Sequence, residues 1–153
     1  MISKYIEVEQ FEMKKAYYPD SIGSGGLGPC IAISIYDFKT RSGYMMHESD
    51  FQHSGLDEKI QEIINDYKDL TKLKLFVAGN SLSSFDSTNQ REYEKATRPF
   101  VEKTLKKYFQ NSQIKINWAP DNHVAELILD TSTGKFELNI QSLDKMSLDE
   151  MFE

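Results

Sequence analysis

Polar and apolar residues alternate over residues 4–14 (KYIEVEQFEMK). A period of two places successive side chains on opposite faces, so this run predicts a β-strand. Later runs rich in apolar and β-branched residues each predict a further strand. They are residues 30–36 (CIAISIY), 44–49 (YMMHES), 73–79 (LKLFVAG) and 113–118 (QIKINW).

Helical spacing occurs twice. From Leu56 onward apolar residues recur every three or four positions, which predicts a helix over 56–69 with Ser54 as its N-cap. A second helix is expected to begin at Gln90 or Pro99 and to end near residue 109. The polar residues 80–89 between them predict a long loop.

The last regular elements form a hairpin. The runs VAELILD and KFELNI flank TSTG, where Gly134 supplies the positive φ that such turns need. Together these patterns predict one α+β domain over residues 1–141, with about six mostly antiparallel strands and two helices outside them. Residues 142–153 are expected to be an acidic tail.

Composition excludes several classes of function. The 153 residues carry a net charge of −6, which argues against nucleic acid because phosphate binding needs a basic surface. No apolar run approaches the roughly 18 residues of a membrane helix, so no membrane insertion is expected. The single cysteine cannot form an internal disulfide, and a cytoplasmic location follows as the expectation.

The run GSGGLGPC, residues 23–30, allows two interpretations. Gly23, Gly25 and Gly28 fit the G-x-G-x-x-G pattern of a phosphate-binding loop. That loop requires a helix directly after the glycines, however, and CIAISIY has strand character. The other interpretation is a flexible loop that presents a reactive thiol at Cys30.

Strand pairing offers a partner for this thiol. If residues 30–36 and 44–49 form a hairpin, a four-residue loop at 37–40 sets Cys30 directly opposite His47. The same loop moved by one residue makes the two diagonal neighbours on one face, whereas an odd loop separates them. Facing Cβ atoms lie about 5 Å apart and diagonal ones about 7–8 Å apart. Either arrangement lets a histidine deprotonate a cysteine. The alternative is a cysteine packed in the core.

These alternatives predict opposite shifts of the Cys30 pKa. An activated thiol next to His47 and to bare loop amides should have a pKa below about 7. A thiol that is only packed among apolar side chains should have its pKa raised by burial.

The stretch PDSIGSGGLGPCIAISIYDFKTRSGYMMH resembles the signature of the chemoreceptor glutamine deamidases, the CheD family. In that family a cysteine is the nucleophile, a histidine is the base, and a hydroxyl residue six positions before the cysteine orients the histidine. The matching residues are Cys30, His47 and Ser24. The run KLFVAGN is similar to a family segment that ends in asparagine, and this match implies a substrate-binding role for Asn80. The run LDTSTGKF resembles the C-terminal hairpin of the family.

The resemblance implies a two-layer β-sandwich flanked by helices, in an αββα-like order. It implies a cysteine-dependent deamidase that converts glutamine side chains to glutamate, with no cofactor or metal. Backbone amides at Gly26, Gly28 and Cys30 would hold the oxyanion. The partner would be a protein bearing the glutamine, with a methyl-accepting chemoreceptor or another chemotaxis signalling protein as a candidate.

Two departures from the family pattern keep other functions open. Pro29 replaces a serine and removes one backbone N–H, and APDNHV at 119–124 replaces a Gly-Gly-x-x-x-Arg region. One alternative is a catalytically weakened binding module that docks a signalling protein. Another is a related cysteine hydrolase that acts on a small amide.

Overall fold

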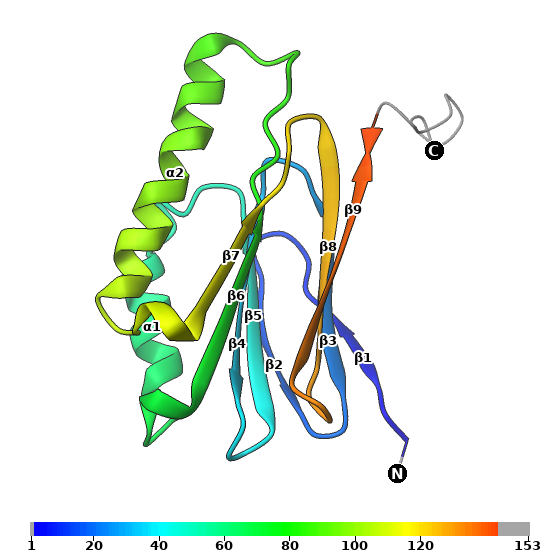
Figure 1. Ribbon diagram of the computed structural model, residues 1–153, viewed down its shortest axis with the longest axis vertical. Helices are drawn as coiled ribbons and strands as arrows, with labels where there is room; N and C mark the ends of the chain where they lie inside the picture. Colours follow the sequence, from blue (N-terminus) through cyan, green and yellow to red (C-terminus); the bar gives the residue numbers. More distant parts are fainter. Residues whose placement is uncertain (1, 144–153) are drawn as a thin grey trace.

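The computed structural model describes residues 2–143, and over these the chain forms two β-sheets and a helical layer (Figure 1). The two sheets face each other, and both α-helices lie on the outer side of one of them. The helices are α1 (Leu56–Ile64) and α2 (Thr88–Lys106), with short 3₁₀ turns at Leu70–Lys72 and Asn111–Gln113.

The sheets contain both parallel and antiparallel strand pairs. The four-stranded sheet has the order β1-β3-β8-β9, with β1 (Tyr5–Glu7), β3 (Ser21–Leu27), β8 (His123–Asp130) and β9 (Lys135–Ser142). The five-stranded sheet has the order β2-β5-β4-β6-β7, with β2 (Met13–Tyr17), β5 (Ser42–Glu48), β4 (Ile31–Asp37), β6 (Leu73–Gly79) and β7 (Ile114–Trp118). The pairs β1–β3 and β6–β7 are parallel, and the other pairs are antiparallel. The α+β sandwich is confirmed, with nine strands within residues 2–143 rather than about six.

Strand β4 is buried along its whole length because it lies between two hydrophobic cores. Ile31, Ile33 and Ile35 pack toward the helices, together with Leu56 and Ile60 of α1. The alternate positions of β4 pack against the four-stranded sheet. The layers therefore run helices, five-stranded sheet, four-stranded sheet, and the expected αββα-like order is wrong in that both helices cover the same face.

Residues 4–14 do not form the single strand that their alternation predicts. The chain leaves β1 in one sheet and enters β2 in the other, and the crossing segment contains Phe11 with φ 72°. A bulky residue rarely adopts this left-handed conformation. The alternating pattern indicates that each of the two strands has one buried face. It does not indicate that β1 and β2 belong to different sheets.

The glycine run also differs from the prediction. Residues 21–27 form β3, an inner strand between β1 and β8, rather than a loop. The register shifts between Ser24 and Leu27, where Gly26 has φ 65°, so the end of the strand bulges before Cys30. The absence of side chains at these glycines weakens strand propensity, but pairing on both sides overrides it.

Helix boundaries are corrected as well. Helix α1 ends at Ile64, and its N-cap is Gly55 with φ 74°, while the Ser54 side chain makes no capping bond. Helix α2 begins at Thr88, where the Ser87 side chain accepts a hydrogen bond from the Gln90 N–H. Pro99 lies within α2 and starts no helix of its own.

Both hairpins are confirmed. Strands β4 and β5 are joined by the four residues 38–41, and β8 and β9 are joined by a turn in which Gly134 has φ 75°. The proposed acidic tail began at residue 142, but β9 includes Ser142; residues 144–153 lie outside the described residues.

Candidate active site

Cys30 and His47 lie on the same face of the β4–β5 hairpin. Asp37 pairs with Ser42 and Ala32 pairs with His47, so Cys30 is the diagonal neighbour of His47. This is the second of the two arrangements that the four-residue loop allows. Diagonal Cβ atoms on one face are typically about 7–8 Å apart. Cys30 belongs to the core between the two sheets, and both residues are buried, with 8% and 5% of their surface exposed.

Ser24 reaches His47 from the opposite sheet and fixes its tautomer. The Ser24 hydroxyl lies 2.6 Å from His47 Nδ1 and donates its own hydrogen to the Val8 carbonyl. Because that hydrogen is already used, the hydroxyl can only accept from the imidazole, so Nδ1 carries the proton. The lone pair of the neutral ring is then on Nε2. This atom is buried and has no hydrogen-bond partner among the described residues.

The backbone of His47 is held by the segment that crosses between the sheets. The Phe11 N–H donates to the His47 carbonyl at 2.7 Å, and the His47 N–H donates to the Glu12 carbonyl at 3.1 Å. The left-handed Phe11 therefore lies directly beside the candidate base, and 68% of the residue is exposed. Backbone strain of this kind occurs often at functional sites.

The pKa shifts of Cys30 and His47 favour the neutral form of both side chains in the resting protein. Burial lowers the pKa of His47 from its ordinary value of 6.5, although the Val8 carbonyl and the Glu48 carboxylate oppose the shift. Burial raises the pKa of the Cys30 thiol, and the carboxylates of Glu48 and Glu94 raise it further. The expectation of a thiolate with a pKa below about 7 is therefore not supported, and the pKa shifts in the direction predicted for a thiol packed in the core. The structure instead places a neutral thiol and a neutral imidazole on the same face of the hairpin, as diagonal neighbours.

We expect the alkylation of Cys30 to show this directly. The rate of reaction with iodoacetamide should rise with a midpoint above 9.0, the ordinary value for the thiol, because the thiolate alone reacts. The midpoint in His47→Gln should be nearly the same, since burial and two carboxylates cause the shift. A midpoint below about 7 in the parent chain would contradict the neutral pair.

The end of β6 holds the cysteine in place. The Asn80 N–H donates to the Cys30 carbonyl at 2.9 Å, and the Ser81 N–H donates to the Gly28 carbonyl at 2.7 Å. Gly79 permits this approach: it has φ 108°, and a Cβ atom there would lie 2.3 Å from the Cys30 oxygen. The pairing of β4 with β6 thus continues past the strand ends to the candidate nucleophile.

Backbone donors for an oxyanion are fewer than the sequence suggested. The Gly28 N–H donates to the Gly26 carbonyl at 3.0 Å, and Pro29 has no N–H. The N–H of Cys30 makes no backbone hydrogen bond with the described residues. The predicted role of Gly28 as a free donor is therefore not supported, and the Cys30 amide, also predicted as a donor, remains the candidate.

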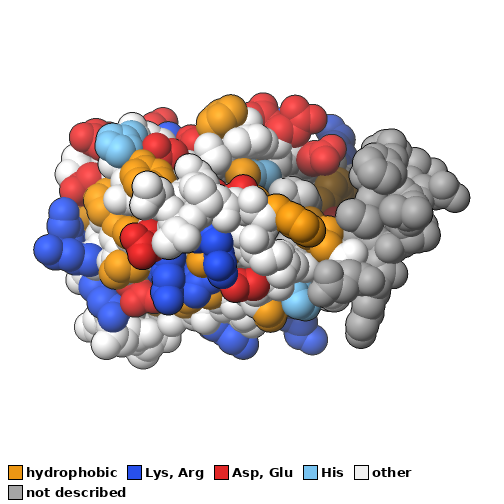
Figure 2. All heavy atoms as spheres, turned by 90° about the horizontal axis from the view of Figure 1, so that it is seen from above, with side chains coloured by type: hydrophobic (Ala, Val, Ile, Leu, Met, Phe, Trp, Pro, Cys, Tyr) orange, Lys and Arg blue, Asp and Glu red, His pale blue; other side chains and the backbone are white. Residues whose placement is uncertain are grey.

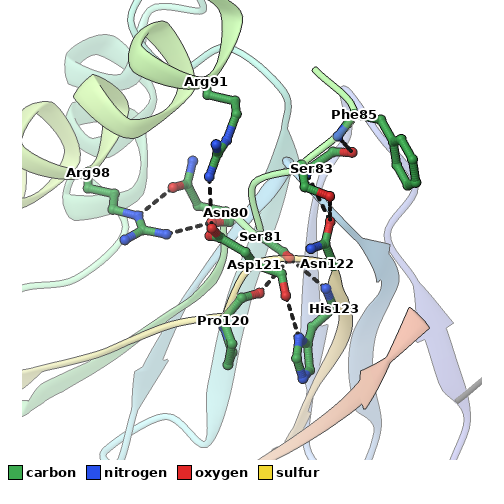
Figure 3. A network of polar contacts seen from close by, with 11 residues as sticks. Asn80, Ser81, Ser83, Phe85, Arg91, Arg98, Pro120, Asp121, Asn122 and His123 are labelled. Atoms are coloured by element: carbon green, nitrogen blue, oxygen red, sulfur yellow. Dashed lines mark hydrogen bonds and ion pairs between the residues drawn. The ribbon is translucent and has the colours of Figure 1, made fainter. Parts of the chain in front are cut away.

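Asn80 belongs to the framework that surrounds the site (Figure 3). Its side-chain oxygen accepts from Arg98 Nε at 2.5 Å, and its side-chain nitrogen donates to the Glu94 carbonyl at 2.9 Å. Arg98 also donates to the Asn80 carbonyl at 2.8 Å. Both ends of the amide already have protein partners, so these contacts give Asn80 a positioning role rather than the predicted contact with substrate.

Residues 119–123, which lie in the segment that differs from the resembled signature, pack against the loop that follows Asn80. The Ser81 hydroxyl donates to the Pro120 carbonyl and accepts from the His123 N–H, while Arg91 pairs with Asp121 at 2.9 Å (Figure 3). Seen from this end of the molecule, acidic, basic and hydrophobic side chains share the surface (Figure 2). Phe85 in the loop has 97% of its side chain exposed. Residues 119–123 therefore fix the loop that borders the site.

Three features near the site had no marker in the sequence. The Val8 carbonyl accepts the hydrogen bond from the Ser24 hydroxyl, Phe11 anchors the backbone of His47, and Glu94 brings a buried carboxylate toward Cys30. One oxygen of Glu94 accepts from Gln90, and the other is buried without a partner among the described residues. A backbone carbonyl carries no side-chain signature, and the spacing of α2 places Glu94 on a helix face without showing what that face covers.

Comparison of the chain with known protein families and with curated proteins finds no match. Within residues 2–143, no helix has the length and apolar character needed to span a membrane. The assignment of function therefore depends on the geometry of Cys30, His47 and Ser24.

Proposed function

We propose that this protein is a cysteine-dependent amidohydrolase that converts the side-chain amide of a protein glutamine to a carboxylate. The observation that carries this proposal is the hydrogen bond between Ser24 and His47 Nδ1, which leaves the unprotonated Nε2 free on the face that it shares with Cys30. A nucleophile, a base and a group that orients the base are the three parts that such a reaction needs.

The chemistry begins from the neutral pair. His47 Nε2 removes the thiol proton as Sγ of Cys30 attacks the carboxamide carbon, forming a C–S bond and an oxyanion. The N–H of Cys30 is the candidate donor to this oxyanion. The imidazolium then protonates the departing nitrogen, which leaves as ammonia, and a thioester remains. Water, deprotonated by the same Nε2, hydrolyses the thioester to glutamate and restores the thiol.

The raised pKa of the thiol places the proton transfer within the chemical step. A resting thiolate would attack without a base, whereas this thiol must lose its proton to His47 as the C–S bond forms. His47 is suited to that task because its lowered pKa keeps it unprotonated at neutral pH. Ser24 stabilises the imidazolium formed, since its hydroxyl oxygen accepts from Nδ1.

The pH dependence of activity follows from the same direction of shift. A base works only when unprotonated, and burial moves the pKa of His47 below 6.5. We therefore expect kcat/KM to stay level through neutral pH and to fall only as the pH drops below 6.5 toward the lowered pKa of His47. A pH–rate profile of the purified chain measures this. An acid limb with its midpoint above 6.5 would contradict the role of His47 as the buried base.

The direct test is the mass shift that accompanies replacement of an amide NH₂ by OH. The full chain would be incubated with a library of glutamine-containing peptides and unfolded proteins, and tandem mass spectrometry would locate modified glutamines. Free glutamine and other small amides, with ammonia as the readout, form a second arm. Cys30→Ala is the blank. Ammonia from small amides without peptide modification would favour a small-molecule hydrolase instead.

A second candidate is a binding module that keeps the site without turnover. Three observations favour it: Cys30 is only 8% exposed, its pKa is raised, and the Gly28 N–H is occupied. Absence of Cys30-dependent modification in both arms of the test would select this candidate. In either case we propose a reducing, cytoplasmic setting for the free thiol, and a chemotaxis receptor or signalling protein as one candidate partner.

A further inference from the structure

A groove of about 480 Å³ opens between the two sheets near the end of β4 that is remote from Cys30. Ile31 of β4 pairs with Gly79 beside the candidate active site, whereas Tyr36 pairs with Lys74, which lines the groove. Five strand residues separate these pairs, which corresponds to about 17 Å. The groove is therefore a feature distinct from the Cys30 site.

The groove exists because the two sheets differ in width. The five-stranded sheet ends at β7 and the four-stranded sheet ends at β9, so residues of β6, β7 and β9 border the opening. Phe76 of β6 packs in the core between the sheets. Lys74 lies two residues before Phe76 on β6, and Lys115 on β7 pairs with Phe76. Both lysines therefore share the face of Phe76. Positions between the sheets of a sandwich are normally apolar.

Three lysines at this groove have no acidic partner. Among the described residues, the side chains of Lys74, Lys115 and Lys135 make no ion pair and no hydrogen bond. Two of the ammonium groups lie over aromatic rings instead, at 5.4 Å from the centroid of Phe38 and 5.7 Å from that of Phe76. In a chain with a net charge of −6, this is a local concentration of unpaired positive charge.

Aromatic rings supply the rest of the lining. Phe76 and Phe136 pack with their centroids 5.4 Å apart and their planes tilted by 34°, and Phe38 at the edge is 48% exposed. A site of this volume falls within the range of small-molecule pockets, about 300–1,000 Å³. Flat apolar faces next to several cations suit a ligand that joins a planar ring to a dense negative charge.

We propose that this groove binds a nucleotide, with the lysines on the phosphates and the exposed face of Phe38 against the base. Lysine is a common phosphate ligand, and aromatic rings accept any base. An extended acidic peptide fits less well. Side chains on one face of a strand are about 6–7 Å apart, so the carboxylates of such a peptide would be less densely charged than a chain of phosphates. The proposal is independent of the amidohydrolase, since no residue of the groove belongs to the Cys30 site.

Isothermal titration of the full chain with ATP and with GTP tests the proposal. We expect saturable binding, with adenosine alone and tripolyphosphate alone each at least tenfold weaker. Lys74→Gln and Lys115→Gln should each weaken ATP binding about tenfold. Phe38→Ala should also weaken it about tenfold, through lost stacking. These side chains are exposed, so thermal unfolding should confirm that the variants fold.

The matched control is Lys103→Gln/Lys106→Gln on α2, compared with Lys74→Gln/Lys115→Gln. Both double variants remove two positive charges, but only the second removes them from the groove. The α2 variant should bind ATP like the parent. Equal losses in the two double variants would mean non-specific attraction and overturn the proposal. Absence of saturable ATP or GTP binding at millimolar concentration, or displacement of ATP by an acidic peptide that binds more tightly, would overturn it too.

Discussion

Replacing His47 by glutamine should lower deamidase activity by about 10²- to 10⁴-fold, the usual contribution of a general base. Glutamine can still donate a hydrogen bond to Ser24, whose hydroxyl lies 2.6 Å from His47 Nδ1, but it cannot accept a proton from Cys30. Because the thiol is neutral at rest, no thiolate would be present to attack without the base. The measurement is the initial rate of glutamine modification by mass spectrometry, with circular dichroism as the check on folding.

Cys30→Ala should abolish the same activity, and the double variant Cys30→Ala/His47→Gln should lose no more than Cys30→Ala alone. The two side chains act on one proton and one bond, so their losses should not add. Ser24→Ala should cause a smaller loss, because Nε2 remains as the base while the ring is less well oriented. Full activity in Cys30→Ala would show that the nucleophile has been assigned wrongly.

The relation between Cys30 and His47 was predictable because it depends on parity. Any even loop keeps the two residues on one face, and the observed loop 38–41 gives the diagonal pairing of the two alternatives. The runs at 73–79 and 124–130 were equally clear, since buried strands are apolar whatever their neighbours are. Their pairing order was not predictable from the chain, because a strand's sequence does not name its partners.

The features that the sequence missed depend on contacts between distant segments. Residues 21–27 form a strand because β1 and β8 pair with both of its edges, although four glycines in the run 23–28 argue for a loop. Burial between the two sheets raises the pKa of Cys30 first, and Glu48 and Glu94 add to the shift; α2 brings Glu94 from 64 positions away. Resemblance placed Asn80 at the site, and the structure shows that its amide is already bonded to Arg98 and to the backbone of α2.

Gly79→Ala should be the most destabilising single-methyl change near the site, at about 3–4 kcal/mol in the free energy of unfolding. The new Cβ would lie 2.3 Å from the Cys30 carbonyl oxygen and 3.3 Å from its carbon, both of them backbone atoms. The residue also has φ 108°, which an L side chain rarely adopts. Neither β4 nor β6 can shift easily, because β4 is paired with β5 and β6, and β6 is paired with β4 and β7. For a chain of this size, this corresponds to a fall of about 10 °C in Tm.

Gly28→Ala is the matched control, since it adds the same methyl group in the β3–β4 connection, whose Gly28 carbonyl accepts from Ser81 just after β6. A Cβ at Gly28 would meet no atom within 4 Å, and its φ lies outside the left-handed region. We expect a change within about 0.5 kcal/mol, as for substitutions at open surface positions. Chemical denaturation of the two variants with the parent measures the difference. If Gly79→Ala unfolds at the same denaturant concentration as Gly28→Ala, then the close approach of β6 to the Cys30 carbonyl does not hold the candidate nucleophile in place.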